Sequence, residues 1–229
     1  GPTNSKVCSE LELDAGLKLG PMTSKSHLTS GSQHSAWHPA WLAVVSSLWL
    51  ASVGNIALWM QVHQLPEVSG LRGFAFAMGF GAIITAALTL ILSLFNWRWL
   101  LKPVLTVFFF SAASGAYFMV SYGIVIDSSM ITNVIQTDTK EAMDLLNWRM
   151  FISFFLLGLM PSWVLWKTPV KSLRWTQQAF NNTLTGAASI IVIVAVLLAI
   201  FQDYASIMRN HTQLRYLVNP LNSFYAIGM

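Results

Sequence analysis

Five long apolar runs constrain the fold of this chain more than any other feature of its sequence. None of them contains Asp, Glu, Lys or Arg, and they lie at about residues 41–60, 74–95, 104–120, 151–166 and 184–201. A helix needs about 20 apolar residues to cross the hydrocarbon core of a bilayer. Within that core every backbone polar group must be paired, which favours helices. The runs therefore predict an all-α membrane protein with five transmembrane helices.

The composition agrees with this class and argues against two others. The chain is 55% hydrophobic and 10% charged, whereas soluble proteins carry about 25% charged residues. Its net charge is +4, but the basic residues lie at the ends of the apolar runs. Because they form no single patch, no nucleic-acid partner is expected, and the expected partners are membrane lipids. Ion-coupled carriers place ionisable residues at membrane depth, so a small carrier is the least favoured function.

Cysteine and histidine are too sparse to predict a metal site in this chain. Cys8 is the single cysteine, which excludes an internal disulfide and a zinc site built from a cysteine cluster. His34 and His38 have a spacing of four residues, but they lie in a Ser-rich stretch next to the first run. His27, His63 and His211 are isolated from one another in the sequence. We therefore predict no metal ligands here.

The segments outside the apolar runs define three predicted parts. Residues 1–36 are rich in Ser, Gly, Lys and Thr and have no periodicity, as in a flexible tail. Two interpretations of residues 1–21 are open, namely a remnant of a removed tag and a native cytoplasmic tail. Residues 37–201 form the predicted transmembrane domain. Residues 202–229 contain too many polar residues to span, so we expect an interfacial segment.

The distribution of basic residues predicts the orientation of the helices. The second and fourth connections carry basic side chains with no acid beside them, and the tail carries Lys18 and Lys25, whereas the other connections are balanced or acidic. The positive-inside rule therefore places the N-terminus in the cytoplasm. Five crossings place the loop at 123–149 and the C-terminus outside, which in a bacterium is the periplasmic side of the inner membrane. The basic residues that carry this inference are Lys18, Lys25, Arg98, Lys102, Lys167, Lys171 and Arg174.

A polar segment, Asp127–Leu146, separates the third and fourth runs and is the best candidate for chemistry. If it is helical, Asn133, Thr137 and Glu141 recur every fourth residue and Asp144 follows at the next i+3 step, so all four share one face. Such a face presents an amide, a hydroxyl and carboxylates to a polar, cationic group. The alternative is an amphipathic helix at the membrane surface whose polar face is only solvated.

Three motifs give the chain a family resemblance. The gapless pattern YFxxxYGxxxDxxMxxNxxQTDxxExxDLL runs from Tyr117 to Leu146. It resembles the periplasmic segment of the lipid A phosphoethanolamine transferases, the family that includes the mobile colistin resistance enzymes. The resemblance extends from about residue 41 to residue 229. The other two motifs comprise Arg98, Trp99, Leu101, Lys102, Pro103 and Val104, and then Arg209, Leu214, Arg215, Tyr216, Asn219 and Pro220.

The resemblance implies a particular architecture and reaction. Members of this family have five transmembrane helices followed by a periplasmic, alkaline-phosphatase-like domain with a nucleophilic threonine and catalytic zinc. In the implied reaction, phosphatidylethanolamine donates phosphoethanolamine to the threonine and diacylglycerol leaves. A lipid A phosphate then accepts the group. The product masks negative charge on the outer membrane, which weakens polymyxin binding and gives colistin resistance.

The resemblance also implies roles for residues of this chain. Asn133, Thr137 and Glu141 match positions that line the phosphoethanolamine pocket, where the carboxylate pairs with the substrate ammonium. Asp144 fits the same face, and a capping or structural ion pair is the alternative for it. Tyr117 and Tyr122 either line the site or lie at the membrane interface.

The sequence stops at residue 229, before the family's periplasmic domain, so the threonine and the zinc ligands are not in it. We expect the chain alone to be inactive. Its expected role is to anchor a catalytic domain in cis and to form one wall of the lipid head-group pocket. The alternative is a non-catalytic membrane module that binds lipid or a protein partner.

Overall fold

Five apolar helical spans make up most of the structure, a computed structural model that describes residues 36–123, 147–222 and 224. Within these ranges the only β feature is a single bridge between Trp37 and Val170. The all-α, five-helix prediction is confirmed. Every span is longer than the apolar run that predicted it, because polar residues continue the helices at their ends. The spans are Pro39–His63, Gly70–Leu94, Leu101–Tyr122, Trp148–Lys167 and Trp175–Ala199.

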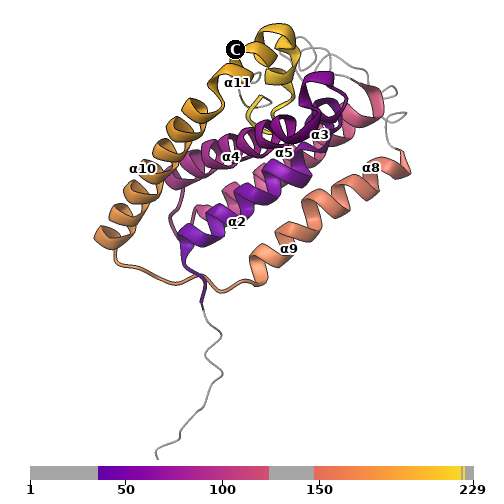
Figure 1. Cartoon of the computed structure of the whole chain (residues 1–229). Coiled ribbons are helices and arrows are strands. Elements are labelled where there is room, and N and C mark those ends of the chain that lie inside the picture. The colour runs from indigo at the N-terminus through magenta and orange to yellow at the C-terminus, as the bar shows by residue number, and fades with distance from the viewer. Residues whose placement is uncertain (1–35, 124–146, 223, 225–229) are drawn as a thin grey trace, which may run out of the picture. The chain divides into compact units, whose positions relative to one another are not determined.

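Two of the spans are interrupted and three are continuous α-helices (Figure 1). The first consists of α2 (Pro39–Ser52), the turn η1 (Val53–Asn55) and α3 (Ile56–His63). The continuous spans are α4 (Gly70–Leu94), α5 (Leu101–Tyr122) and α10 (Trp175–Ala199). The fourth consists of α8 (Trp148–Ser153), η3 (Phe154–Leu159) and α9 (Met160–Lys167). The shorter elements are η2 (Pro66–Val68), α11 (Phe201–Asn210) and η4 (Thr212–Leu217).

Proline and glycine mark the ends of the helices, as their backbone preferences require. Pro39 is the first residue of α2, and the His38 Nδ1 atom accepts a hydrogen bond from the Ala40 amide. Pro103 lies in the first turn of α5, where a missing amide hydrogen has no cost. That helix ends at Gly123, whose φ of 64° places it in the left-handed region. A side chain at this position would strain the backbone.

Pro161 perturbs the fourth span without ending it. A proline ring collides with the carbonyl group four residues earlier and removes one backbone hydrogen bond. The residues just before it, Phe154–Leu159, adopt a wider π-helical turn that accommodates this collision. Beside the proline, the Ser162 hydroxyl donates to the Gly158 carbonyl at 2.6 Å. The fourth span therefore contains a π-turn before Pro161 and resumes as α9.

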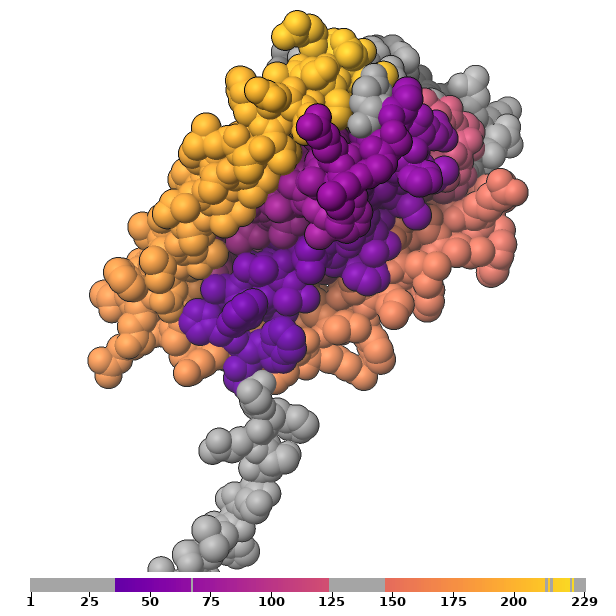
Figure 2. Space-filling model, in the orientation of Figure 1, coloured from indigo at the N-terminus to yellow at the C-terminus, as the bar shows by residue number. Residues whose placement is uncertain are grey.

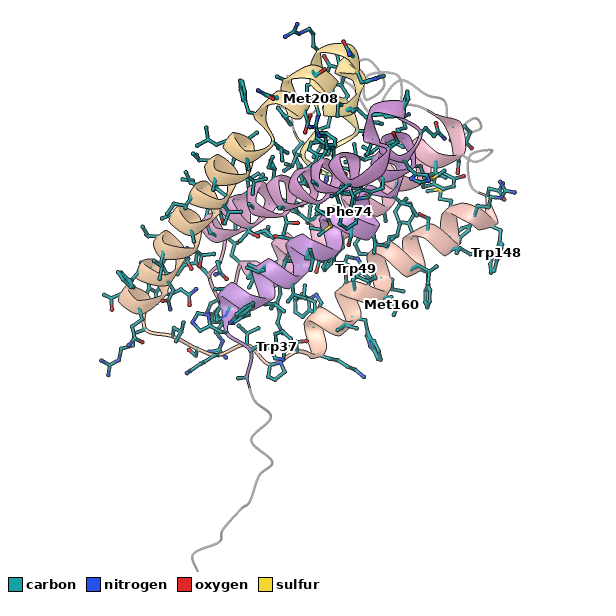
Figure 3. The ribbon with its side chains drawn as sticks, in the orientation of Figure 1. Trp37, Trp49, Phe74, Trp148, Met160 and Met208 are labelled. Carbon is teal, nitrogen blue, oxygen red and sulfur yellow. The ribbon has the colours of Figure 1, made fainter. Side chains whose placement is uncertain are left out.

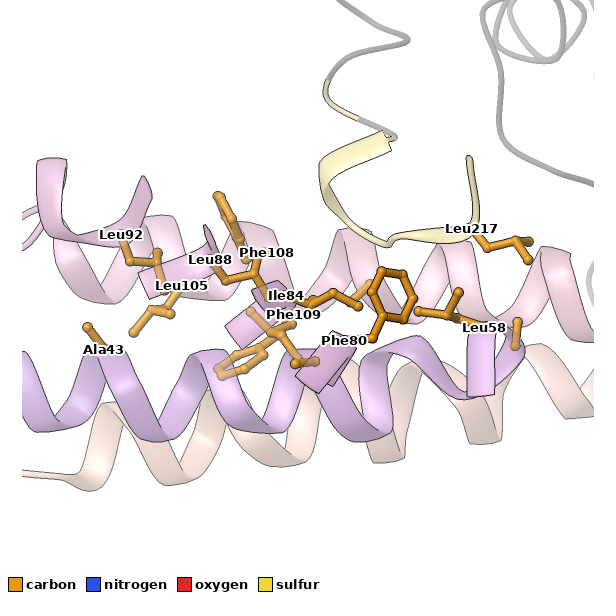
Figure 4. Packing of buried hydrophobic residues seen from close by; sticks show 14 of the residues in the cluster. Ala43, Leu58, Phe80, Ile84, Leu88, Leu92, Leu105, Phe108, Phe109 and Leu217 are labelled. Carbon is orange, nitrogen blue, oxygen red and sulfur yellow. The ribbon is translucent and has the colours of Figure 1, made fainter. Parts of the chain in front are cut away.

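The buried core lies between the first three spans. Leucine and phenylalanine side chains of α4 and α5 contribute to this core (Figure 4). Ala43 and Ala112 are almost fully buried, and their small size lets the helices approach closely. The fourth and fifth spans instead expose most of their large apolar side chains, as expected of surfaces that face acyl chains.

One end of the helix bundle, which we call the basic end, joins the start of the first span to the connection before α10. The Lys102 ammonium donates to the carbonyls of Trp166 and Thr168 at 3.1 and 2.9 Å, at the C-terminus of α9. A cation is favourable at this position because the last carbonyls of a helix are unpaired. The Trp37 amide donates to the Pro169 carbonyl at 2.8 Å. Figure 3 shows Trp37 here, far from Trp148 at the opposite end.

Candidate functional site

The predicted pocket residues Asn133, Thr137, Glu141 and Asp144 lie outside the described residues, and so does the predicted amphipathic helix that carries them. The structure does describe what flanks that segment. Residues 124–146 begin after the end of α5 and return to the start of α8, at the opposite end from the basic end. The described elements next to this segment are therefore the end of α5 and the start of α8.

Tyr117 and Tyr122, the two predicted site residues that the structure describes, belong to one aromatic cluster in the last turns of α5. Their ring centroids are 6.0 Å apart in an edge-on arrangement, and Phe118 lies 5.3 Å from Tyr117 and 6.0 Å from Tyr122. Tyr117 is 4% exposed, whereas Tyr122 is 43% exposed. The structure thus separates the two tyrosines, since only Tyr122 presents much of its surface to a ligand.

A small pocket of about 170 Å³ lies beside this cluster, where α3, α5 and η4 meet. The amide side chains of Gln61 and Gln64 and the apolar side chains of Met119 and Leu217 are among its lining residues. Gly123 also lines it, so the pocket lies where the chain leaves α5 for the predicted site. This edge of the bundle combines hydrogen-bonding and apolar groups.

Asn55 and Asn219 form a reciprocal contact that joins the C-terminal segment to the bundle, and we call it the clasp. The Asn219 amide donates to the Asn55 side-chain oxygen at 2.6 Å, and the Asn55 side-chain nitrogen donates back to the Asn219 carbonyl at 2.5 Å. The Asn219 side chain also donates to the Ala112 carbonyl at 2.7 Å. Both asparagines are 1% exposed. Paired amides of this kind satisfy one another where water cannot.

The interruption of the first span and two glycines make the clasp possible. At η1 the α-helical pattern stops, and the Gly54 carbonyl accepts from the Asn219 side chain at 3.3 Å. On α5, a Cβ atom at Gly115 would overlap the Asn219 amide group, so only glycine leaves room for it. The clasp therefore connects the first span, the third span and the C-terminal segment at three points.

The C-terminal segment also packs against the bundle through apolar contacts. Tyr204 of α11 lies 6.3 Å from Phe80 of α4, and Phe224 lies 4.9 Å from Phe108 of α5. Ile207 is 3% exposed. The predicted interfacial segment is thus a helix and a turn that rest on the membrane helices.

Sequence reasoning missed the clasp. Asn219 entered only as part of a family motif, and Asn55 was counted within an apolar run. The available signal was Asn55 itself, because a lone amide inside a membrane run usually pairs across helices.

A metal centre is not supported by the residues at hand. No group of three or more His, Cys, Asp or Glu side chains comes together within 36–123 and 147–222.

Comparison with known proteins gives a consistent result. Residues 84–229 match the family described as phosphoethanolamine transferase EptA/EptB. The chain is 29% identical over 202 residues to phosphatidylethanolamine transferase Mcr-2 of Escherichia coli, and 30% identical over 203 residues to Mcr-1. Each alignment covers 86% of this chain and 37% of the relative. The chain thus spans about a third of the length of these relatives.

The fold also matches a solved structure, the integral membrane protein lipooligosaccharide phosphoethanolamine transferase A (EptA) from Neisseria meningitidis. The TM-score is 0.72 at 22% identity, over 82% of this chain and 34% of that one. At this level of identity the match establishes the fold.

Proposed function

Since the chain belongs to the phosphoethanolamine transferase EptA/EptB family, we propose that it is the membrane domain of an enzyme that moves phosphoethanolamine from phosphatidylethanolamine to a lipid A phosphate. The observation that carries this proposal is the family match over residues 84–229, which includes the polar segment and the C-terminal segment. The names of the relatives agree, since two are phosphatidylethanolamine transferases and the solved structure is a lipooligosaccharide phosphoethanolamine transferase.

The polar segment supplies the proposed head-group contacts. Glu141 pairs with the ammonium of the substrate, because a charge-assisted hydrogen bond is about twice as strong as a neutral one. In this proposal Asn133 and Thr137 add neutral hydrogen bonds, and Asp144, three positions after Glu141, is a further candidate. Tyr122 offers an accessible ring next to this segment, and the buried Tyr117 supports it.

A periplasmic domain in cis supplies the nucleophilic threonine and the zinc in this proposal. The membrane domain contributes position, and holding two reacting groups in register removes much of the entropic barrier to their reaction. The clasp supports a positioning role for the membrane domain, because it fixes the C-terminal segment, which leads out of the helix bundle. The segment 1–229 alone has no transferase activity in this account.

The complete reading frame, expressed in polymyxin-sensitive bacteria, tests the function. Lipid A from these cells is expected to carry added phosphoethanolamine by mass spectrometry, and polymyxin susceptibility is expected to fall because the added ammonium offsets a phosphate charge. The segment 1–229 alone is the matched control and is expected to give unmodified lipid A. Unmodified lipid A from cells that hold the complete protein in their membrane would contradict the proposal.

The proposed location is the bacterial inner membrane, with the basic end in the cytoplasm and the C-terminal segment in the periplasm. Five basic side chains gather at the basic end, whereas the charges at the opposite end are mixed. This asymmetry supports the orientation through the positive-inside rule. The five side chains are Arg98, Lys102, Lys167, Lys171 and Arg174.

Cysteine labelling tests the orientation. In a Cys8→Ser background, Ser69→Cys is expected to react in intact cells with a thiol reagent that does not cross the inner membrane. Ser172→Cys is expected to react only after lysis. Both serines are exposed and lie in connections at opposite ends of the helices. The reverse labelling pattern would invert the assignment.

A further inference from the structure

A pocket of about 340 Å³ lies at the basic end, between the connection that follows α4 and the residues that start α10. Figure 2 shows the first turns of α10, in orange, at the same end of the molecule as the start of α2, in indigo. Residues 97–99 line the pocket from the first of these segments, and Ser172, Leu173 and Trp175 line it from the second. The basic motif that begins at Arg98 thus contributes to a pocket, although the function proposed above gives that motif no role.

Contacts between the two segments give this pocket its shape without a ligand. The rings of Trp97 and Trp175 pack against one another, with centroids 5.1 Å apart. Gln178, which also lines the pocket, is 5% exposed. Its side-chain nitrogen donates to the Asn96 carbonyl at 2.5 Å and to the Asn182 side-chain oxygen at 2.9 Å. The start of α10 is thus fixed to the connection after α4, so a ligand meets a site that is already formed.

The charge around this pocket is positive. Arg98 lines it and is exposed, and the exposed residues Lys171 and Arg174 enclose two of its lining residues. The acidic residues that the structure describes, Glu67 and Asp203, belong to η2 and α11 at the opposite end of the spans. The first turn of α10 contains no acid either. Since no described carboxylate offsets these cations, the pocket favours an anion.

The position of the pocket along the spans indicates which kind of anion it meets. Its lining residues either follow Leu94, the last residue of α4, or lie just before α10 and in its first turn. The ends of two apolar spans mark the boundary of the hydrocarbon core, where lipid head groups lie. Trp99 and Trp175 line the pocket and are 89% and 80% exposed, as is typical of tryptophans at a membrane interface. A lipid head group therefore fits this position better than a soluble anion.

We propose that this pocket binds the head group of an anionic phospholipid that carries two phosphates, as cardiolipin does. Arg98 supplies a cation from one segment, and Lys171 and Arg174 supply cations from the other. An arginine side chain binds a phosphate through two parallel hydrogen bonds. Once one phosphate is bound, the second is held close to the other segment at a high effective concentration. A lipid with a single phosphate lacks this second contact. The proposal does not depend on head-group transfer, because the pocket and the polar segment lie at opposite ends of the spans.

Competition between two anionic lipids tests this pocket. The purified chain is offered equal amounts of cardiolipin and phosphatidylglycerol with the same acyl chains, and native mass spectrometry measures which lipid is retained. Cardiolipin is expected to be preferred. Arg98→Gln is expected to lower cardiolipin binding about tenfold, because it removes the charged hydrogen bonds to one phosphate. Arg72→Gln, the matched control, removes the same charge at an exposed position at the other end of α4. It is expected to change cardiolipin binding less than about twofold, because salt screens a charge at that distance.

The same measurement can overturn the proposal. Equal retention of the two lipids would mean that the second phosphate has no partner in the pocket. Equal losses in Arg98→Gln and Arg72→Gln would mean that only the overall charge of the chain attracts the lipid. Displacement of cardiolipin by inorganic phosphate would assign the pocket to a soluble anion. Arg174→Gln removes a cation from the other segment and repeats the test if Arg98→Gln lowers the melting temperature. Unchanged cardiolipin binding in a well-folded variant of either arginine would contradict the site.

Discussion

Glu141→Gln is expected to slow phosphoethanolamine transfer by the complete enzyme while the amount of protein in the membrane stays the same. The substitution keeps the shape of the side chain and removes its charge, so the ammonium of the substrate loses its ionic partner. A hydrogen bond to a charged group contributes about 1.5–3 kcal/mol, which corresponds to roughly 10- to 100-fold in rate. The effect is measured as the initial rate at which labelled phosphoethanolamine is transferred from phosphatidylethanolamine to lipid A.

Asp138→Asn is the matched control for that variant. It makes the same acid-to-amide change three residues away in the same polar segment. Position 138 follows Thr137 by one residue, about 100° around a helix from the shared face. We expect its transfer rate to stay within about twofold of the parent, which is less than 0.5 kcal/mol. Equal losses of transfer rate in both variants would mean that the segment needs only its overall negative charge. Full activity of Glu141→Gln would contradict the proposed role of Glu141 in the pocket.

Asn55→Leu is expected to free the C-terminal segment from the helix bundle. The substitution removes the partner of the Asn219 amide and of the Asn219 carbonyl, both of which are buried. A buried polar group left without a partner costs about 1–3 kcal/mol, so protection of the η4 amides from hydrogen exchange falls roughly 10- to 100-fold. Asn55→Ala adds no atoms and is expected to give the same loss.

Asn96→Leu controls for the general effect of removing a buried asparagine. Asn96 is fully buried at the basic end, and its side-chain nitrogen and oxygen have no hydrogen-bond partner in the described part of the chain. Replacing an unpaired buried amide with an apolar group of similar size is neutral or stabilising. Exchange in η4 is therefore expected to stay as in the parent. If Asn55→Leu leaves this exchange unchanged as well, the clasp does not hold the segment.

The sequence was sufficient to predict the five spans because hydropathy over 20 residues is a local property. The break at Val53–Asn55 was not predicted, because one amide does not interrupt an apolar run and the partner of Asn55 lies far along the chain. Asn55 and Asn219 are 164 positions apart. No local pattern encodes such a pair. The π-turn before Pro161 was partly predictable, because proline disrupts a helix wherever it occurs inside one.

Some features of the candidate site could also be predicted from the sequence, and others could not. The i+4 spacing of Asn133, Thr137 and Glu141 can be read from the sequence, and their shared pocket remains a prediction. The sequence did not separate Tyr117 from Tyr122, because burial depends on which helices pack against each face of α5.

Lipid selectivity of the purified chain shows whether this membrane domain itself forms part of the head-group site. Phosphatidylethanolamine and phosphatidylglycerol with identical acyl chains compete for the protein, and native mass spectrometry measures which is retained. Because the acyl chains are identical, the two lipids differ only in their head groups. We expect preferential retention of phosphatidylethanolamine, and loss of that preference when Asn133→Ala and Glu141→Ala are combined. Equal retention of the two lipids, or a preference that survives the double substitution, would contradict it.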